Sequence, residues 1–370
     1  MKKVLGVVLL LLLFMLSELY FYGDEEISTL NDYEENVIEV SDPTELANEP
    51  VITDNLSFTA VEIEGCSQEN IYLEEKEFQY YSYTCETEEQ LIHLGNELVT
   101  GLTADGTIFL TEEAEEDYDE VLLDYGFTDK EEVLIWYDVD ENTLVDSYDM
   151  SVPNFLEDYQ IDREQHEKNW DHFIKLIPRE YRLSVVDYTV FAHDYTLGYV
   201  EQFTYEDDLP TDWGFAMNVI DIESETERSA TIIHEFAHLL TLGEDQVTPY
   251  VSEKSCQFLL LDEGCTQSDS YIQVFFDKFW VDIRDEVNSL ASDPDMLYDY
   301  YLDNEDNFVN DYAASSLEED IAESFTYFVL QLFPDNTNRV QDEKISFFYD
   351  YPELVELRIE ILSRLQSIMA

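Results

Sequence analysis

A single helix-forming segment limits what this chain can fold into more than any other feature. Ser224 and Glu227 have the spacing of a capping box, in which a side chain at the first position and another three positions later each bond a backbone amide. The pattern predicts a helix over residues 224–243. Since residues four positions apart lie on the same face of a helix, His234 and His238 must point to the same side.

These two histidines, with Glu235 between them, form a pattern that can carry chemistry. Two imidazoles one turn apart can bind a single metal ion, and a glutamate beside them can take a proton from a water molecule on that ion. Short motifs of this kind also arise by chance. Only six histidines occur in the chain, however, and two of them stand at this offset on a capped helix. We therefore predict a zinc site with ligands His234 and His238 and with Glu235 as the general base.

A catalytic zinc ion commonly has three protein ligands and one open position, so a third ligand is needed. The metzincin arrangement would place glycine at 241 and histidine at 244. It is excluded because these positions hold Thr241 and Glu244. The remaining standard solution is a carboxylate from elsewhere in the chain. Glu244, Asp245 and Glu263 are reserve candidates for that role.

The best distant candidate lies on a second predicted helix over residues 315–333, whose latter half is apolar nearly all round and is expected to be buried. Glu319 and Glu323 lie one turn apart on this helix. Carboxylates that enter a buried helix are costly unless a cation compensates them, and zinc would do so. The alternative is that Glu319 closes a capping box with Ser316 while Glu323 lies at a solvated edge.

The histidine pair, followed by a downstream helix with Glu319 and Glu323, resembles the gluzincins, which are zinc peptidases whose third ligand is a glutamate. Residues 312–325 are most similar to the catalytic domain of anthrax lethal factor and its relatives, and the resemblance covers roughly residues 150–335. It implies that Glu319 is the third zinc ligand and that Glu323 orients the site from one turn further on. It also implies that Tyr312 is the catalytic tyrosine, which can donate to the oxyanion of the reaction.

The same resemblance implies the fold, an α+β zincin-like domain in which a twisted mixed sheet lies beside the histidine helix and a second helix supplies Glu319. In zincins the strand nearest the histidine helix pairs with extended substrate, and residues 213–222 are the candidate for that strand. The chain departs from the family in the long interval between His238 and Glu319, which contains a cysteine pair and an aromatic segment over residues 271–287. We treat residues 244–311 as an insertion.

The charge of the chain excludes one class of partner. Asp and Glu number 86 against 17 Lys and Arg, which gives a formal net charge of -69 that repels the phosphates of nucleic acids. Hydrophobic residues nevertheless make up 45% and aromatic residues 14% of the chain, so a folded protein is expected. An acidic excess spread along the whole chain is typical of a solubility adaptation to a salty or otherwise harsh exterior.

The N-terminus predicts export. Lys2 and Lys3 precede an unbroken apolar run over residues 4–16, which is the arrangement of a secretory signal. When the run is extended through the aromatic residues up to position 22, it becomes long enough for an uncleaved anchor, so both remain open. In either case the acidic bulk is expected outside the cytoplasm, secreted or tethered, and only this segment would contact the membrane.

Four cysteines fall into two locally spaced pairs. In an exported chain they predict two disulfides, Cys66 with Cys85 and Cys256 with Cys265. A four-cysteine zinc site is the rival interpretation. It requires tight two-residue spacings, which these cysteines lack.

The order of the predicted elements divides the chain. A helix around residues 88–99 precedes strands at 133–137 and 183–192 and a helix over 162–177 between them. The predicted organisation is a signal peptide or anchor over residues 1–23, an acidic linker over 24–55, an N-terminal α+β region over 56–148 and a zincin-like metallopeptidase domain over 149–370.

Together these features predict an exported zinc metalloendopeptidase that hydrolyses peptide or protein substrates, with Glu235 taking the proton of a zinc-activated water. The alternative is a catalytically inactive zincin-fold protein with a binding or structural role at the cell surface. Self-processing or attack on host proteins is suggested by the family resemblance alone. The sequence leaves the physiological substrate, the cleavage specificity and the oligomeric state open.

Overall fold

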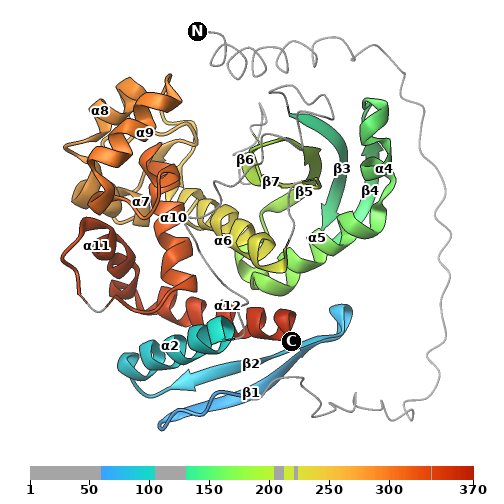
Figure 1. The fold of residues 1–370 in the computed structure, drawn as a ribbon, viewed down its shortest axis with the longest axis horizontal. Helices are drawn as coiled ribbons and strands as arrows, with labels where there is room; N and C mark the ends of the chain where they lie inside the picture. Colours follow the sequence, from blue (N-terminus) through green and yellow to red (C-terminus); the bar gives the residue numbers. More distant parts are fainter. Residues whose placement is uncertain (1–59, 105–130, 204–211, 221–223, 335) are drawn as a thin grey trace, which may run out of the picture. The chain divides into compact units, whose positions relative to one another are not determined.

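The computed structural model describes residues 60–104, 131–203, 212–220, 224–334 and 336–370 (Figure 1). The described residues all belong to one compact unit. The predicted signal or anchor over residues 1–23 and the predicted linker over 24–55 lie outside the described residues. Within the described part of the chain, no helix is both long and apolar enough to cross a membrane.

The centre of the α+β fold is a mixed five-stranded sheet with the strand order β4-β3-β5-β7-β6. Strands β5 and β7 run parallel, whereas β3 is antiparallel to both of its neighbours and β6 is antiparallel to β7. Strand β7 is therefore hydrogen-bonded on both sides, and β6 is an edge strand of the sheet that the described residues form. The bounds are β3 (Glu132–Asp140), β4 (Thr143–Asp149), β5 (Val185–Ala192), β6 (Gly198–Gln202) and β7 (Trp213–Asn218).

One face of this sheet packs against α5 (Arg163–Leu176) through aromatic side chains, and α6 (Glu225–Leu242) contacts α5 and the strand β6. The rings of Phe173 on α5 and Phe215 on β7 are stacked with centroids 4.2 Å apart. The ring centroids of Trp170 on α5 and Tyr188 on β5 are 5.3 Å apart. Alternate residues of a strand point to one face, so Tyr188 and its alternate neighbours supply this core. The aromatic layer fixes α5 on the sheet, and α6 lies beside α5.

The opposite side of α6 packs against α10 (Leu317–Leu330), as Figure 1 also shows. Phe236 of α6 meets Phe325 of α10 edge to face, with ring centroids 6.0 Å apart. The remaining helical half of the unit surrounds α10. Its main elements are α7 (Tyr271–Phe275), the π-helical turn η5 (Phe276–Trp280), α8 (Arg284–Leu290), α9 (Pro294–Asp303), α11 (Val340–Phe347) and α12 (Pro352–Met369).

The N-terminal elements pack on α12 at the far end of α10. They are the hairpin β1 (Cys66–Leu73) and β2 (Phe78–Cys85) and the helix α2 (Glu88–Ala104). The buried Arg358 of α12 donates to the carbonyls of Phe328 (2.6 Å) and Gln331 (2.7 Å), which lie at the end of α10. A Cβ at Gly95 of α2 would lie 1.8 Å from Nη1 of Arg358, so glycine leaves room for this cap.

The boundary that we drew between residues 148 and 149 falls at the end of β4. Strands β3 and β4 lie before it, but they belong to the same sheet as β5, which lies after it.

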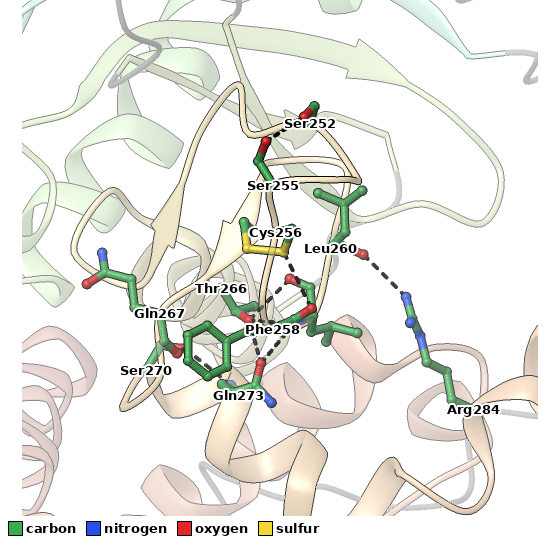
Figure 2. Close-up of a disulfide and its surroundings, with 12 residues drawn as sticks. Ser252, Ser255, Cys256, Phe258, Leu260, Thr266, Gln267, Ser270, Gln273 and Arg284 are labelled. Atoms are coloured by element: carbon green, nitrogen blue, oxygen red, sulfur yellow. Dashed lines mark hydrogen bonds between the residues drawn. A yellow bond between two sulfur atoms is a disulfide. The ribbon is translucent and has the colours of Figure 1, made fainter.

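Both expected disulfides are present and confirm the predicted pairing. Cys66 and Cys85 join the first and last residues of the β1–β2 hairpin. Cys256 and Cys265 close a loop between the short strands β8 (Val247–Thr248) and β9 (Cys265–Thr266). Figure 2 shows this loop, which is attached to α7 because the side-chain oxygen Oε1 of Gln273 accepts from the backbone amide of Leu259 at 3.0 Å. The two disulfides suggest an extracytoplasmic location.

Candidate metal centre

Two helices supply the three donor atoms of the candidate site. His234 and His238 lie on α6, whose N-cap Ser224 accepts from the amide of Glu227 at 3.0 Å, as the capping box predicts. Glu319 lies in the first turn of α10. Among the described residues, these three form a group of donors that could hold a metal ion, with all donor atoms within 4.8 Å of one another.

The spacing of the donors fits one ion. Nε2 of His234 lies 3.2 Å from Nε2 of His238 and 3.0 Å from Oε2 of Glu319, and the third edge, from His238 to Glu319, is 3.4 Å. Nitrogen and oxygen ligands about 2.0–2.1 Å from a tetrahedral ion lie roughly 3.3–3.4 Å from one another. The triangle therefore has nearly the size of one face of a tetrahedral coordination shell.

Glu319 has two roles. Its backbone amide donates to Oγ of the N-cap Ser316 at 3.1 Å, which is half of the capping box considered as the alternative to a ligand role. Its carboxylate, however, points to the two imidazoles. The cap thus fixes the backbone of Glu319 at the start of α10 and leaves the side chain free for the site.

Glu323, one turn further along α10, holds the other side of His234. Its Oε1 lies 2.7 Å from Nδ1 of that ring, and its Oε2 accepts from Nδ2 of Asn310 at 2.8 Å. A carboxylate on the outer nitrogen of a ligating histidine orients the ring and leaves the lone pair of the inner nitrogen for the metal. The carboxylate of Glu323 therefore lies against the outer nitrogen of His234.

The charges of the site would make a proton and a metal ion compete for the same donor atoms. Burial alone would lower the pKa of His234, but the hydrogen bonds to Glu319 and Glu323 raise it well above its ordinary value. Burial would likewise raise the pKa of Glu319, and the two imidazoles outweigh it and lower the pKa. A histidine must lose the proton on its ligating nitrogen to bind a metal. Metal binding by this group is therefore expected to release protons.

Glu235 lies beside the donors with only 5% of its surface exposed. Burial raises the pKa of its carboxyl, the two histidines oppose that effect, and Glu319 adds to it. A Cβ at Gly198 of β6 would lie 3.2 Å from Cγ of Glu235 and 2.9 Å from Cγ2 of Thr231. Glycine thus allows the edge strand to pass directly against the glutamate.

Tyr312 lies in the short turn η7 (Tyr312–Ala314), just before α10. Its ring centroid is 5.7 Å from that of His234, and 51% of the side chain is exposed. Burial of the hydroxyl end and the negative charges of Glu319 and Glu235 raise the pKa of Tyr312 well above its ordinary value. The phenol therefore stays protonated at neutral pH and can act as a hydrogen-bond donor.

The reserve candidates lie outside the group of donors. Glu244 and Asp245 are exposed beyond the end of α6. Glu263 is half-buried in the disulfide-closed loop, and burial raises its pKa while the charge of His238 lowers it. The carboxylate of Glu263 thus lies near the site, whereas that of Glu319 contacts both imidazoles.

One expectation about this site is wrong. We took residues 213–222 as the strand that could pair with a substrate, but β7 (Trp213–Asn218) lies between β5 and β6 and has no free edge. All six of its residues are buried, and such an unbroken buried run is typical of an interior strand. Strand β6, which the sequence analysis did not identify, occupies the edge instead. Asn310 was also missed, since no local pattern marks it.

Comparison of the chain with protein-family models, with curated proteins and with solved structures finds no match.

Proposed function

We propose that this protein is a zinc-dependent peptidase. The observation that carries the proposal is the triangle of His234, His238 and Glu319 donors with the buried Glu235 beside it. Two imidazoles and a carboxylate with one open position are the donor set of catalytic zinc sites that hydrolyse peptides. The same residues carry the resemblance to the gluzincins, and a zincin-like fold is part of the proposal.

The residues around the donors can perform the steps of hydrolysis. Zinc in this position would lower the pKa of a water molecule to about 7 and polarise the substrate carbonyl. Glu235 takes the proton of the attacking water and passes it to the leaving amine. The Tyr312 hydroxyl donates to the oxyanion as negative charge develops on the former carbonyl oxygen.

The edge strand supplies a place for an extended substrate. Among the strands of the described residues, β6 pairs with β7 along one side alone, and we infer that its other side bonds the backbone of a peptide. Because Gly198 lies against Glu235, a peptide paired with β6 would run past the general base. The geometry therefore favours a peptide backbone as the substrate.

The test is Glu235→Gln, with the exposed Glu244→Gln as the matched control. We expect Glu235→Gln to retain zinc and to lose at least about 100-fold in kcat for cleavage of a diverse peptide library, because the proton acceptor is gone. The control should cleave like the wild type.

Equal cleavage by Glu235→Gln and wild type would contradict the proposal. Zinc binding without any cleavage by the wild type would favour the alternative, a scaffold with a binding role.

A further inference from the structure

One side chain joins two parts of the candidate site that are separate in sequence. Asn310 lies between η6 (Glu305–Asn307) and η7. Its Nδ2 donates to Oε2 of Glu323 at 2.8 Å, and its Oδ1 accepts from the backbone amide of Ala313 at 2.9 Å. The other oxygen of Glu323 contacts Nδ1 of His234 at 2.7 Å. A chain of polar contacts therefore runs from the ring of His234 through Glu323 and Asn310 to the turn that bears Tyr312.

The surroundings leave Asn310 little freedom. Phe308 and Val309 before it are 0% and 4% exposed, and Ala313 and Ala314 after it are fully buried. The chain is thus packed on both sides of Asn310. Its side chain joins the carboxylate of Glu323 to the backbone amide of Ala313. Only an amide side chain of this length offers a donor at one branch and an acceptor at the other.

We propose that Asn310 is a positioning residue that sets the metal-ligating face of His234 and the turn of Tyr312 in one fixed arrangement. The role in peptide hydrolysis rests on the proposed function, whereas the effect on metal affinity does not. Glu323 can orient His234 only while its own carboxylate is held, and Asn310 supplies the donor that holds it. The same amide fixes the backbone one residue after Tyr312.

Asn310→Asp separates the two ends of this chain of contacts. The new carboxylate can still accept from the amide of Ala313, but it cannot donate to Glu323 and it places a second negative charge beside it. We expect the zinc affinity of the full chain to fall by about 10–100-fold, which is the usual effect of losing an outer partner of a ligating histidine. Asn338→Asp, which adds the same charge at an exposed position, should leave the affinity unchanged.

Glu323→Gln alone should also weaken zinc binding, because the two amide groups at positions 310 and 323 would each offer a donor to the other. The double variant Asn310→Asp with Glu323→Gln restores a donor and acceptor pair between positions 310 and 323 and keeps an acceptor for the amide of Ala313. The amide introduced at position 323 accepts from His234 and donates to the carboxylate introduced at position 310. We expect its zinc affinity to return to within about 3-fold of wild type, a rescue that general loss of stability would not produce.

Zinc affinity is measured by competition with a chromophoric chelator, so the result does not depend on peptidase activity. Single variants that bind zinc like the wild type, or a double variant no better than the weaker single variant, would overturn the positioning role. If the affinity pattern holds while the wild type cleaves no peptide, the proposed function fails and the positioning role stands. In an active enzyme, both single variants should also lower kcat more than they change KM.

Discussion

Two neighbouring carboxylates on α10 have opposite surroundings. Asp320 is fully buried, and its Oδ2 lies 2.6 Å from Nζ of Lys344 and accepts from Nε1 of Trp280 at 2.6 Å. Glu319, the residue before it, contacts the imidazoles of His234 and His238 instead. Two adjacent residues thus carry a carboxylate compensated by a lysine and a carboxylate grouped with two imidazoles that could hold a metal ion.

Asp320 and Glu319 differ in the cationic groups that lie beside their carboxylates. The charge of Asp320 is compensated inside the chain, and Nζ of Lys344 also lies 4.1 Å from the ring centroid of Phe308. Around Glu319, by contrast, Glu235 and Glu323 add further carboxylates to a group whose described ion pairs are all with histidines. Buried like charges are costly unless a cation joins them. The first arrangement is complete as a structural pair, and the second is a group of donors that could hold a metal ion.

The largest effect is expected at the structural pair. Lys344→Met should lower the free energy of unfolding by about 3–5 kcal/mol, because it leaves the buried Asp320 without its partner. Lys278→Met, the same change at an exposed position, should stay within about 0.5 kcal/mol of wild type. Urea unfolding of the chelator-treated proteins measures both. Loss of zinc affinity in a folded Lys344→Met variant would mean that the Lys344–Asp320 pair and the donor group around Glu319 do not act independently.

A smaller and opposite pattern is expected for Glu319→Ala. Its zinc affinity should fall by at least about 100-fold, or about 2.7 kcal/mol, because a ligand is lost. The stability of the metal-free protein should fall by less than that of Lys344→Met, since removing one of three carboxylates relieves repulsion. Chelator competition and urea unfolding provide the two values. Unchanged zinc affinity would mean that another acidic residue is the third ligand. Glu263 would then be the first candidate to test.

Asp187 of β5 is another buried carboxylate, and its described contacts include neither a lysine nor an imidazole. It is 8% exposed and lies directly opposite Asp138 of β3 in the sheet. Burial, helped by the charges of Glu201 and Asp138 and opposed by the hydroxyl of Thr189, raises the pKa of Asp187 to about 6. The charged form of this residue therefore destabilises the fold.

The sign of the pH dependence follows from that shift. An ordinary aspartate in the unfolded chain ionises near pH 3.8, so the favourable contribution of protonated Asp187 is present below that pH and is lost as the pH rises to about 6. Asp187→Asn should stabilise the protein by roughly 2–3 kcal/mol at pH 7 and by little at pH 3.5. Thermal unfolding at both pH values checks this. Equal effects at the two pH values would mean that the carboxylate is not desolvated in the fold.

The local parts of the site could be predicted from the sequence, and the parts made by distant segments could not. Helical periodicity places His234 and His238 on one face, and the caps at Ser224 and Ser316 mark where the two helices begin. These signals lie within a few residues of one another. They also reduce the choice of a third ligand to a short segment that contains Glu319.

The strand that lies at the sheet edge, and the contacts between side chains of different segments, depend instead on how distant parts of the chain pack together. Nothing in the residues of β6 distinguishes an edge strand from an interior one, although the unbroken apolar run of β7 was a signal that we interpreted wrongly. Asn310 contacts a residue on another helix, and a lone asparagine in a loop has no periodicity to mark it. The α+β class and both disulfides follow from local patterns, whereas the sheet order depends on contacts between distant segments.

The central claim is that His234, His238 and Glu319 bind one metal ion. The most direct test is zinc titration of the full chain, followed by X-ray absorption spectroscopy of the loaded protein. We expect one zinc ion per chain, with nitrogen and oxygen ligands at about 2.0–2.1 Å and scattering from two imidazoles. Absence of stoichiometric zinc binding, or binding that is unchanged when His234→Ala and His238→Ala are combined, would contradict the account.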